Sequence, residues 1–166
     1  MGQLTWKLVL PLTVISFVTV TKWWYAIVVD GPDDMLTGFP LPYVCSGWHT
    51  SMSLQIFLTE FFVDLLTYFS FWFVSVFCVN RFLKPISIPK SISIGLLTVS
   101  GLIVTGMTLL AINPDNIYVA KRDFDMKVLA TGYKFIWQDE PDAEFYDHHL
   151  ARYRNEKTTP NTNHEK

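Results

Sequence analysis

Charged side chains are scarce in this sequence. Lys, Arg, Asp and Glu together make up 17% of its 166 residues, whereas they approach a quarter of an average soluble domain. Hydrophobic residues account for 50% of the chain, and the mean hydropathy is +0.25. This balance is typical of a membrane protein and argues against an ordinary soluble domain.

Cysteine and known catalytic motifs are also sparse. Cys45 and Cys78 fall in a predicted loop and deep in a predicted span, so we expect two free thiols. The net charge of -2, with no basic cluster among aromatic residues, argues against nucleic acid as a partner. The sequence has no nucleophile elbow and no phosphate-binding glycine loop. It therefore favours a non-catalytic protein and predicts no cofactor.

Three long apolar runs dominate the first two thirds of the chain, at about residues 8–29, 58–82 and 91–112. About 20 apolar residues cross the hydrocarbon core of a bilayer, so each run is long enough to span it. The last run stops at Asn113 and Pro114, where proline restricts the preceding residue and removes a donor. The sequence predicts an integral membrane protein, mainly α, with three transmembrane helices in residues 1–112 and an outer loop at 30–51.

The remaining residues are of mixed charge and predict a small extracytoplasmic α+β appendage at 113–157. Apolar and polar residues alternate on both sides of Thr131 and Gly132, a pattern that indicates a β-hairpin. Pro141 then opens a predicted helix that runs to about Glu156, with acids early and basic residues late, as the helix dipole favours. Residues 158–166 read as a flexible polar tail.

Charges in the short flanks of the spans predict the orientation. The connection between the second and third runs carries Arg81, Lys84 and Lys90, and the connection after the first run begins with Asp30, Asp33 and Asp34. Positively charged flanks stay on the cytoplasmic side. We therefore expect a multi-pass protein of a bacterial inner (cytoplasmic) membrane, with a cytoplasmic N-terminus and an extracytoplasmic C-terminus.

Two acids, Glu60 and Asp64, interrupt the second apolar run. At 1.5 Å rise per residue, Asp64 lies roughly 25 Å above Arg81, and Lys22 lies roughly 21 Å above the start of the first run. This similar depth suggests an intramembrane charge pair between Lys22 and Asp64, with Glu60 one turn outward. The alternative interpretation is structural, with Lys22 reaching the interface, Glu60 in water and Asp64 held by a hydroxyl such as that of Thr67.

Small and hydroxyl side chains form one face of the third run. They recur every three or four residues, at Ser91, Gly95, Thr98, Gly101, Thr105 and Thr108. Such a face lets helix backbones approach closely. It predicts a helix-packing face, centred on Gly95, Thr98, Gly101 and Thr105, that packs either on the second helix of this chain or on a partner subunit.

A stiff, proline-rich segment precedes the second run. Its notable residues are Gly38, Phe39, Pro40, Pro42 and Trp48, and they describe an extended stretch along the membrane surface. Over about residues 8–83, this loop and the aromatic-rich run after it resemble small uncharacterised bacterial inner-membrane proteins that carry a Gly-Phe-Pro-x-Pro loop. The resemblance implies a membrane topology and no activity.

One cluster in the predicted C-terminal helix contains side chains that bind metals. Glu144 and His148 lie one turn apart, and His149 follows directly. Neighbouring residues point in different directions on a helix, and a zinc site needs three or four ligands, so a solvated helix face is favoured over a metal site. This cluster is the one sequence feature that would support the hypothesis of a membrane-bound enzyme.

Taken together, the pattern predicts an accessory or scaffold subunit of a larger membrane assembly. Its expected partners are membrane lipids and other membrane-protein subunits or copies of itself. The motivation is a surplus of aromatic residues in the second run, more than a three-helix unit can bury, together with the helix-packing face. The alternative from a different class is a small ion- or proton-coupled transport component that uses Glu60, Asp64 and Lys22.

Overall fold

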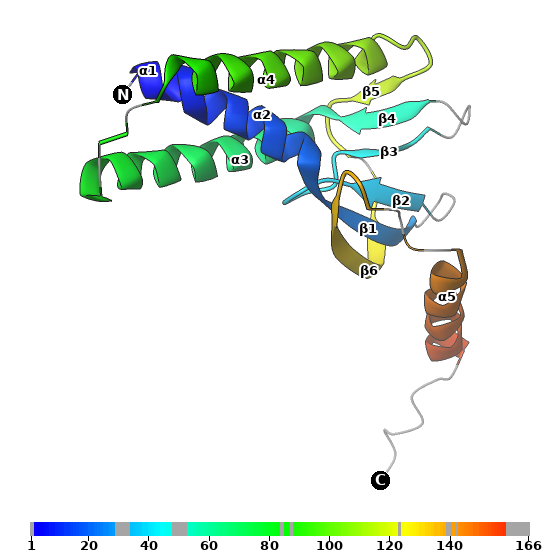
Figure 1. The fold of residues 1–166 in the computed structure, drawn as a ribbon. Helices are drawn as coiled ribbons and strands as arrows, with labels where there is room; N and C mark the ends of the chain where they lie inside the picture. The colour runs from blue at the N-terminus through cyan, green and yellow to red at the C-terminus, as the bar shows by residue number, and fades with distance from the viewer. Residues whose placement is uncertain are drawn as a thin grey trace.

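Three helical segments lie side by side, and a β-sheet covers one end of them (Figure 1). The computed structural model describes residues 2–28, 34–47, 53–83, 85–86, 88–122, 124–138, 141 and 143–158. The first segment consists of α1 (Gly2–Leu4), the π-helical η1 (Thr5–Val9) and α2 (Leu10–Thr19). The second is α3 (Leu58–Cys78) with η2 (Val79–Leu83), and the third is α4 (Lys90–Ala111). By length and composition, all three can cross a membrane.

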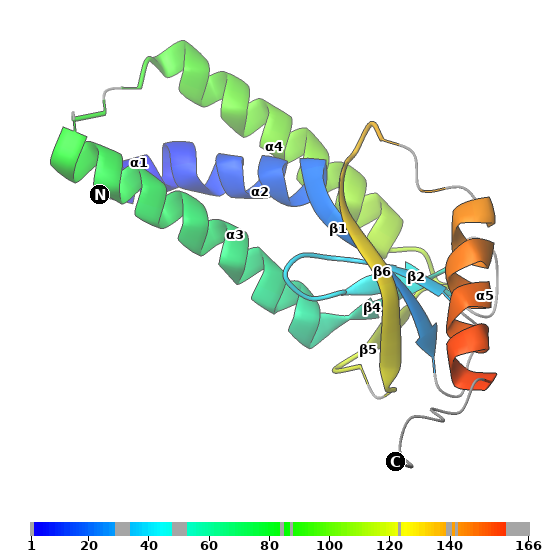
Figure 2. The same ribbon diagram turned by 90° about the horizontal axis from the view of Figure 1, so that it is seen from below.

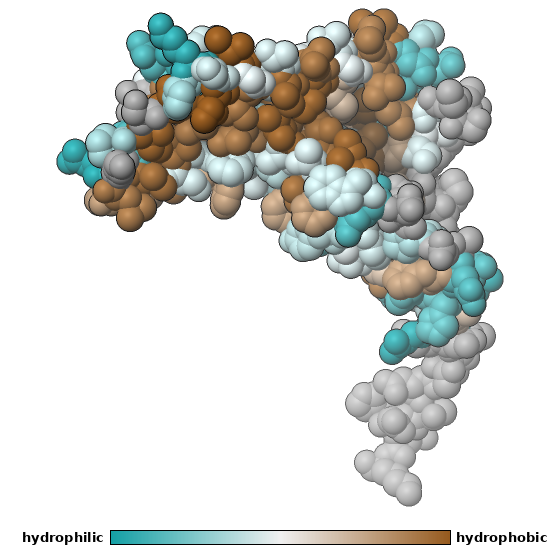
Figure 3. Space-filling view, viewed as in Figure 1, coloured by the Kyte–Doolittle hydropathy of each residue, from teal (hydrophilic) through white to brown (hydrophobic). Residues whose placement is uncertain are grey.

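The first helical segment lies between the other two. Helix α2 packs against both α3 and α4, and these two lie on opposite sides of it (Figure 2). The Trp72 indole N–H of α3 donates to the Ser16 hydroxyl of α2 at 2.9 Å. On α4 the buried residues are Ser93 and Ser100. A broad hydrophobic surface therefore remains exposed along the helices (Figure 3).

The sheet has six strands: β1 (Val20–Val28), β2 (Asp34–Thr37), β3 (Val44–Ser46), β4 (Leu54–Phe57), β5 (Ile117–Val119) and β6 (Met126–Phe135). Their spatial order is β5-β4-β3-β2-β1-β6. Neighbouring strands are antiparallel except for the parallel pair β4 and β5. The sheet is therefore mixed, and it combines segments from both sides of the α3–α4 pair.

Helices and strands run directly into one another at this end of the molecule. Strand β1 begins at Val20, the residue after α2 ends, and α3 begins at Leu58, the residue after β4 ends. β-branched and aromatic side chains, which favour strands, are frequent in β1. The helical segments consequently enter the sheet without long linkers.

Both faces of the sheet are covered. On one face a core of Ala26, Leu36, Cys45 and Phe57 packs against side chains that include Phe124. On the other face lies α5 (Ala143–Thr158), with the rings of Tyr146 and Tyr25 4.5 Å apart and those of Phe145 and Trp23 5.9 Å apart. The hydrophobic core thus lies on one face of the sheet, and α5 packs against β1 on the other.

The predicted fold class, mainly α with a small hairpin appendage, is wrong. The structure has a six-stranded mixed sheet, and three of its strands, β1, β2 and β3, come from residues assigned to the end of the first span or to the outer loop. The first helix ends at Thr19, and the following residues are β1. A continuous apolar run does not distinguish a buried helix from a buried strand, because both are hydrophobic throughout.

The predicted hairpin around Gly132 is also wrong, because β6 continues through it as a single strand. Gly132 pairs with Trp23 of β1. A Cβ at Gly132 would lie 2.6 Å from Cζ2 of the Trp23 indole. Glycine in a strand interior often marks such a close approach rather than a turn. Gly132 therefore admits an aromatic ring against the strand.

Candidate functional site

Two carboxyl groups are buried where α3 leaves the sheet. Glu60 and Asp64 are four residues apart, so they share one face of the helix. Their exposed fractions are 7% for Glu60 and 0% for Asp64. Carboxylates are almost never fully buried unless they are paired. This pair of acids is therefore the strongest candidate for a functional site.

Asp64 binds the proline-rich loop between β2 and β3. Its Oδ1 accepts the backbone N–H of Leu41 at 2.9 Å, and the N–H of Phe39 also forms a backbone hydrogen bond with this carboxyl group. Pro40 and Pro42 have no N–H to offer. Between residues 39 and 42, the two available backbone donors thus both go to Asp64.

Gly38 allows the chain to enter this loop. Its φ of 153° lies in a region that side chains rarely adopt, and a Cβ there would clash with the carbonyl oxygen of Leu41. Its N–H donates to the carbonyl of Lys22 at 2.9 Å, and its carbonyl accepts the Trp24 indole N–H at 2.8 Å. The Gly-Phe-Pro-x-Pro motif is therefore a loop that is fixed on β1 and closes around a carboxylate. Trp48, the remaining member of the predicted outer-loop motif, lies outside the described residues.

Glu60 faces a different segment, the connection from β5 towards β6. Its Oε1 accepts the backbone N–H of Arg122 at a long 3.4 Å. The neighbouring Thr59 donates both its N–H and its hydroxyl to the carbonyl of Ala120, at 3.0 and 2.6 Å. The first turn of α3 therefore holds the segment that crosses the core face of the sheet.

Each carboxyl group keeps one oxygen without a donor. Within the described residues, Oε2 of Glu60 and Oδ2 of Asp64 are buried and have no hydrogen-bond partner. Buried polar atoms of this kind are rare, and each costs about 1–3 kcal/mol. A proton on each carboxyl group, or a bound cation, would satisfy these oxygens, and this is the chemistry that the two groups can support.

Aromatic rings surround Asp64. Phe17 of α2 stacks on Tyr43 with centroids 5.3 Å apart, and it meets Tyr68 edge to face at 5.6 Å. The Tyr68 hydroxyl donates to the carbonyl of Val20 at 2.6 Å. Burial, and secondarily the charge of Asp64, raises the pKa of Tyr43 above its ordinary value, so this phenol stays neutral. The carboxyl group sits in an apolar, water-poor setting.

Lys22 does not join the carboxyl pair. It lies in β1, and its ammonium is 3.6 Å from the centroid of the Trp24 ring, a cation–π contact. The structure thus brings Glu60 and Asp64 together and connects Asp64 to the predicted loop motif, but it leaves Lys22 on the sheet. The similar depth predicted for Lys22 and Asp64 assumes helical rise through Lys22, whereas this residue lies in a strand.

The predicted helix-packing face of α4 is exposed. Gly95, Thr98, Gly101 and Thr105 are all exposed, and a Cβ built at either glycine meets nothing within 4 Å. The two threonine hydroxyls donate to carbonyls of their own helix. The face therefore does not pack on α3; α4 packs on α2 and η1 instead, and its buried residues are Ser93 and Ser100.

The weak metal candidates lie on α5, far along the chain from the carboxyl pair. His149 packs against the ring of Phe145, with centroids 4.4 Å apart, and His148 and Glu144 are exposed. Among the described residues, no group of three or more His, Cys, Asp or Glu side chains could hold a metal ion. These residues read as the outer surface of a helix that packs on the sheet.

A scan against protein-family models, a search of curated proteins and a search of solved structures each find no match to this chain. The geometry alone must therefore support a functional assignment.

Proposed function

We propose that this chain is a non-catalytic accessory or scaffold subunit of a membrane assembly. The three apolar helices span a bacterial cytoplasmic membrane, the N-terminus is cytoplasmic, and the sheet with α5 lies on the extracytoplasmic side. Other membrane-protein subunits, or further copies of this chain, pack on the exposed helix faces. The observation that carries this proposal is the exposed helix-packing face of α4.

Burial along the helices supports this assignment. In the most apolar 18-residue stretch of each helical segment, 11% of the residues are buried in Leu58–Leu83 and 6% in Lys90–Ala111. Lipid can cover a surface of large apolar side chains, but a face of glycine and self-satisfied threonine residues suits close backbone approach by another helix. The hydroxyls of Thr98 and Thr105 bond within α4, so such a partner would meet no unpaired polar group there.

The experiment is affinity purification of the tagged full chain in a mild detergent, with mass spectrometry of the proteins that accompany it. We expect defined partners with the wild type and their loss with Gly95→Leu or Thr105→Leu, which add bulk to the face. Leu110→Phe adds bulk to an exposed position outside the face and should keep the partners. A wild-type chain that always runs as a monodisperse monomer contradicts the proposal.

One observation favours the second candidate, an ion- or proton-coupled transport component. It is the pair of donorless oxygens on Glu60 and Asp64. In reconstituted vesicles, Asp64→Asn should then abolish a cation or proton flux while the protein stays folded. Two features weigh against this candidate: both carboxyl groups already hold backbone segments, and Lys22 is engaged elsewhere.

A further inference from the structure

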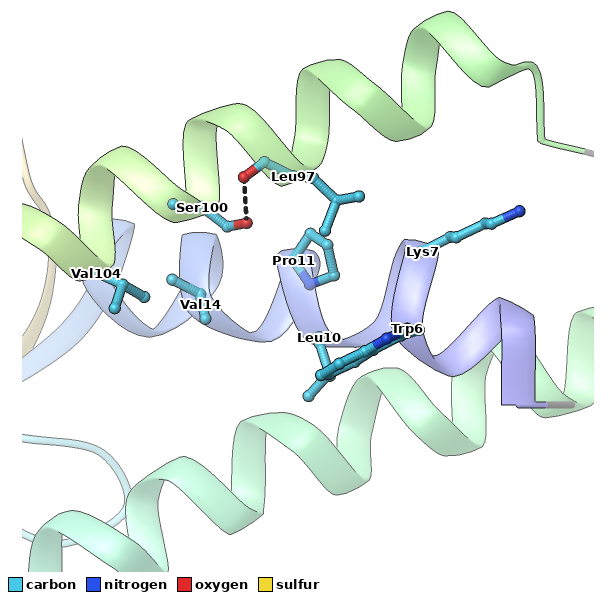
Figure 4. Close-up of a pocket in the computed structure, with 9 residues that line it drawn as sticks. Trp6, Lys7, Leu10, Pro11, Val14, Leu97, Ser100 and Val104 are labelled. Carbon is cyan, nitrogen blue, oxygen red and sulfur yellow. Dashed lines mark hydrogen bonds between the residues drawn. The ribbon is translucent and has the colours of Figure 1, made fainter.

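A groove of about 440 Å³ runs between the N-terminal helix and α4 (Figure 4). Its walls are apolar, with Leu10 and Val14 on one side and Leu97 and Val104 on the other. Figure 4 shows Val14 and Val104 facing one another across it. The Ser100 hydroxyl donates to the carbonyl of Leu97 at 3.1 Å, so it adds no free polar group. The groove therefore suits an apolar occupant.

One end of the groove differs in chemistry from the rest. Trp6 and Lys7 line this end, and both side chains are exposed. In Figure 4 the ammonium of Lys7 extends away from the apolar walls. Lys7 and Val14 are seven residues apart, so the apolar walls run roughly 10 Å along the helix from the charge. The charge stands at the mouth, and the apolar part lies deeper along the helix.

This arrangement complements a lipid with a negative headgroup. Tryptophan is enriched at the level of the headgroups, and basic pockets between transmembrane helices on the cytoplasmic side bind anionic headgroups. A partner helix would need no cation at the mouth of the groove. The charge at one end and the apolar walls therefore favour one occupant, an anionic phospholipid with a chain between α2 and α4.

We propose that the groove between the N-terminal helix and α4 binds an anionic phospholipid of the inner leaflet, with its phosphate at Lys7 and an acyl chain along Leu10, Val14, Leu97 and Val104. This inference rests on the membrane placement proposed above. Gly101 lines the groove beside the proposed acyl chain, and no atom of a packed neighbour lies within 4 Å of the position that its Cβ would take. A larger side chain there would occupy the groove without disturbing a packed neighbour.

Native mass spectrometry of the full chain in mild detergent tests this proposal. The probes are phosphatidylglycerol and phosphatidylcholine with identical acyl chains. One Lys near an anionic surface contributes about 1 kcal/mol, so we expect about fivefold tighter binding of phosphatidylglycerol by the wild type. Lys7→Gln should remove this preference, while Lys121→Gln, which removes an exposed charge beside the sheet, should retain it.

Gly101→Leu should weaken the binding of both lipids, because it fills the groove. Gly106→Leu is the matched control, since it adds the same side chain to an equally open position on α4 that does not line the groove. Equal affinity of the wild type for both lipids, or equal loss with the two leucine variants, overturns the lipid site. The lipid site is also overturned if Gly101→Leu loses a protein partner while its lipid binding is unchanged. Failure of the chain to enter the membrane fraction instead contradicts the proposed function, which separates the two outcomes.

Discussion

The carboxylate of Asp64 accepts the backbone N–H of Leu41, a residue that stands between two prolines, at 2.9 Å. Asp64 belongs to α3, and Leu41 belongs to the loop between two strands of the sheet. A part-buried polar contact thus connects a helix with membrane-spanning composition to the sheet at its end. Because Phe39 also donates to this carboxyl group, the N–H groups of Phe39 and Leu41 both depend on Asp64 as their acceptor.

Removing the acceptor should release this loop. Asp64→Ala leaves two backbone donors unsatisfied, each at about 1–3 kcal/mol, so we expect a marked loss of stability and faster hydrogen exchange at the Leu41 amide. Asp64→Asn keeps one acceptor oxygen and should cost less. Thermal unfolding in detergent and amide exchange measure both effects. Asp125→Ala, at an exposed acid, is the control, and unchanged exchange at Leu41 in Asp64→Ala would contradict this role.

Lys22 should couple to Trp24 and not to Asp64. A double-mutant cycle of Lys22→Gln with Trp24→Leu should report about 0.5–2 kcal/mol, the range of cation–π contacts from exposed to desolvated sites, because both residues are half-buried. The cycle of Lys22→Gln with Asp64→Asn should report a coupling near zero, because the Lys22 ammonium lies over the Trp24 ring. Unfolding free energies of the single and double variants provide both values. Substantial coupling between Lys22 and Asp64 would restore the charge pair that the sequence suggests.

Gly132 should not tolerate a side chain. A Cβ there meets the Trp23 indole at 2.6 Å, and overpacking of this kind costs about 1–3 kcal/mol. Gly132→Ala should therefore lower the unfolding temperature, and Trp23→Leu in the same chain should recover part of the loss. Gly95→Ala, where nothing lies within 4 Å, should be neutral or slightly stabilising because alanine favours a helix. Equal effects of the two glycine variants would argue against the Trp23 contact.

Local patterns reveal the helices of this chain far better than its sheet. The apolar runs near α3 and α4 are long and contain few charges, which is a strong signal. Strands β2, β3, β4 and β5 are three or four residues long, too short to show a reliable period. The parallel partners β4 and β5 are adjacent only because two long helices lie between them in sequence. Such pairing depends on the tertiary fold, so no local sequence pattern predicts it.

The candidate site was recognisable in parts but not as a whole. An acid such as Asp64 within an apolar run is unusual, and the loop from Gly38 to Pro42 is distinctive. Because proline has no N–H, Pro40 and Pro42 leave Phe39 and Leu41 as the residues that can donate a backbone hydrogen bond between positions 39 and 42. Their acceptor lies 23 residues further along the chain from Leu41, and only the folded structure shows that Asp64 fills this position.

The orientation of the helices can be tested with cysteines at their two ends. Lys7, Arg81 and Lys90 lie at the end remote from the sheet, in short flanks where the positive-inside rule applies, whereas basic residues in the folded sheet region count little. In a Cys78→Ala background, because Cys78 is exposed and Cys45 is buried, Lys121→Cys should react with a membrane-impermeant maleimide in intact cells. Lys90→Cys should react only after the cells are permeabilised. The reverse pattern would invert the orientation, and reaction of both variants in intact cells would mean that the helices do not separate the two ends across a membrane.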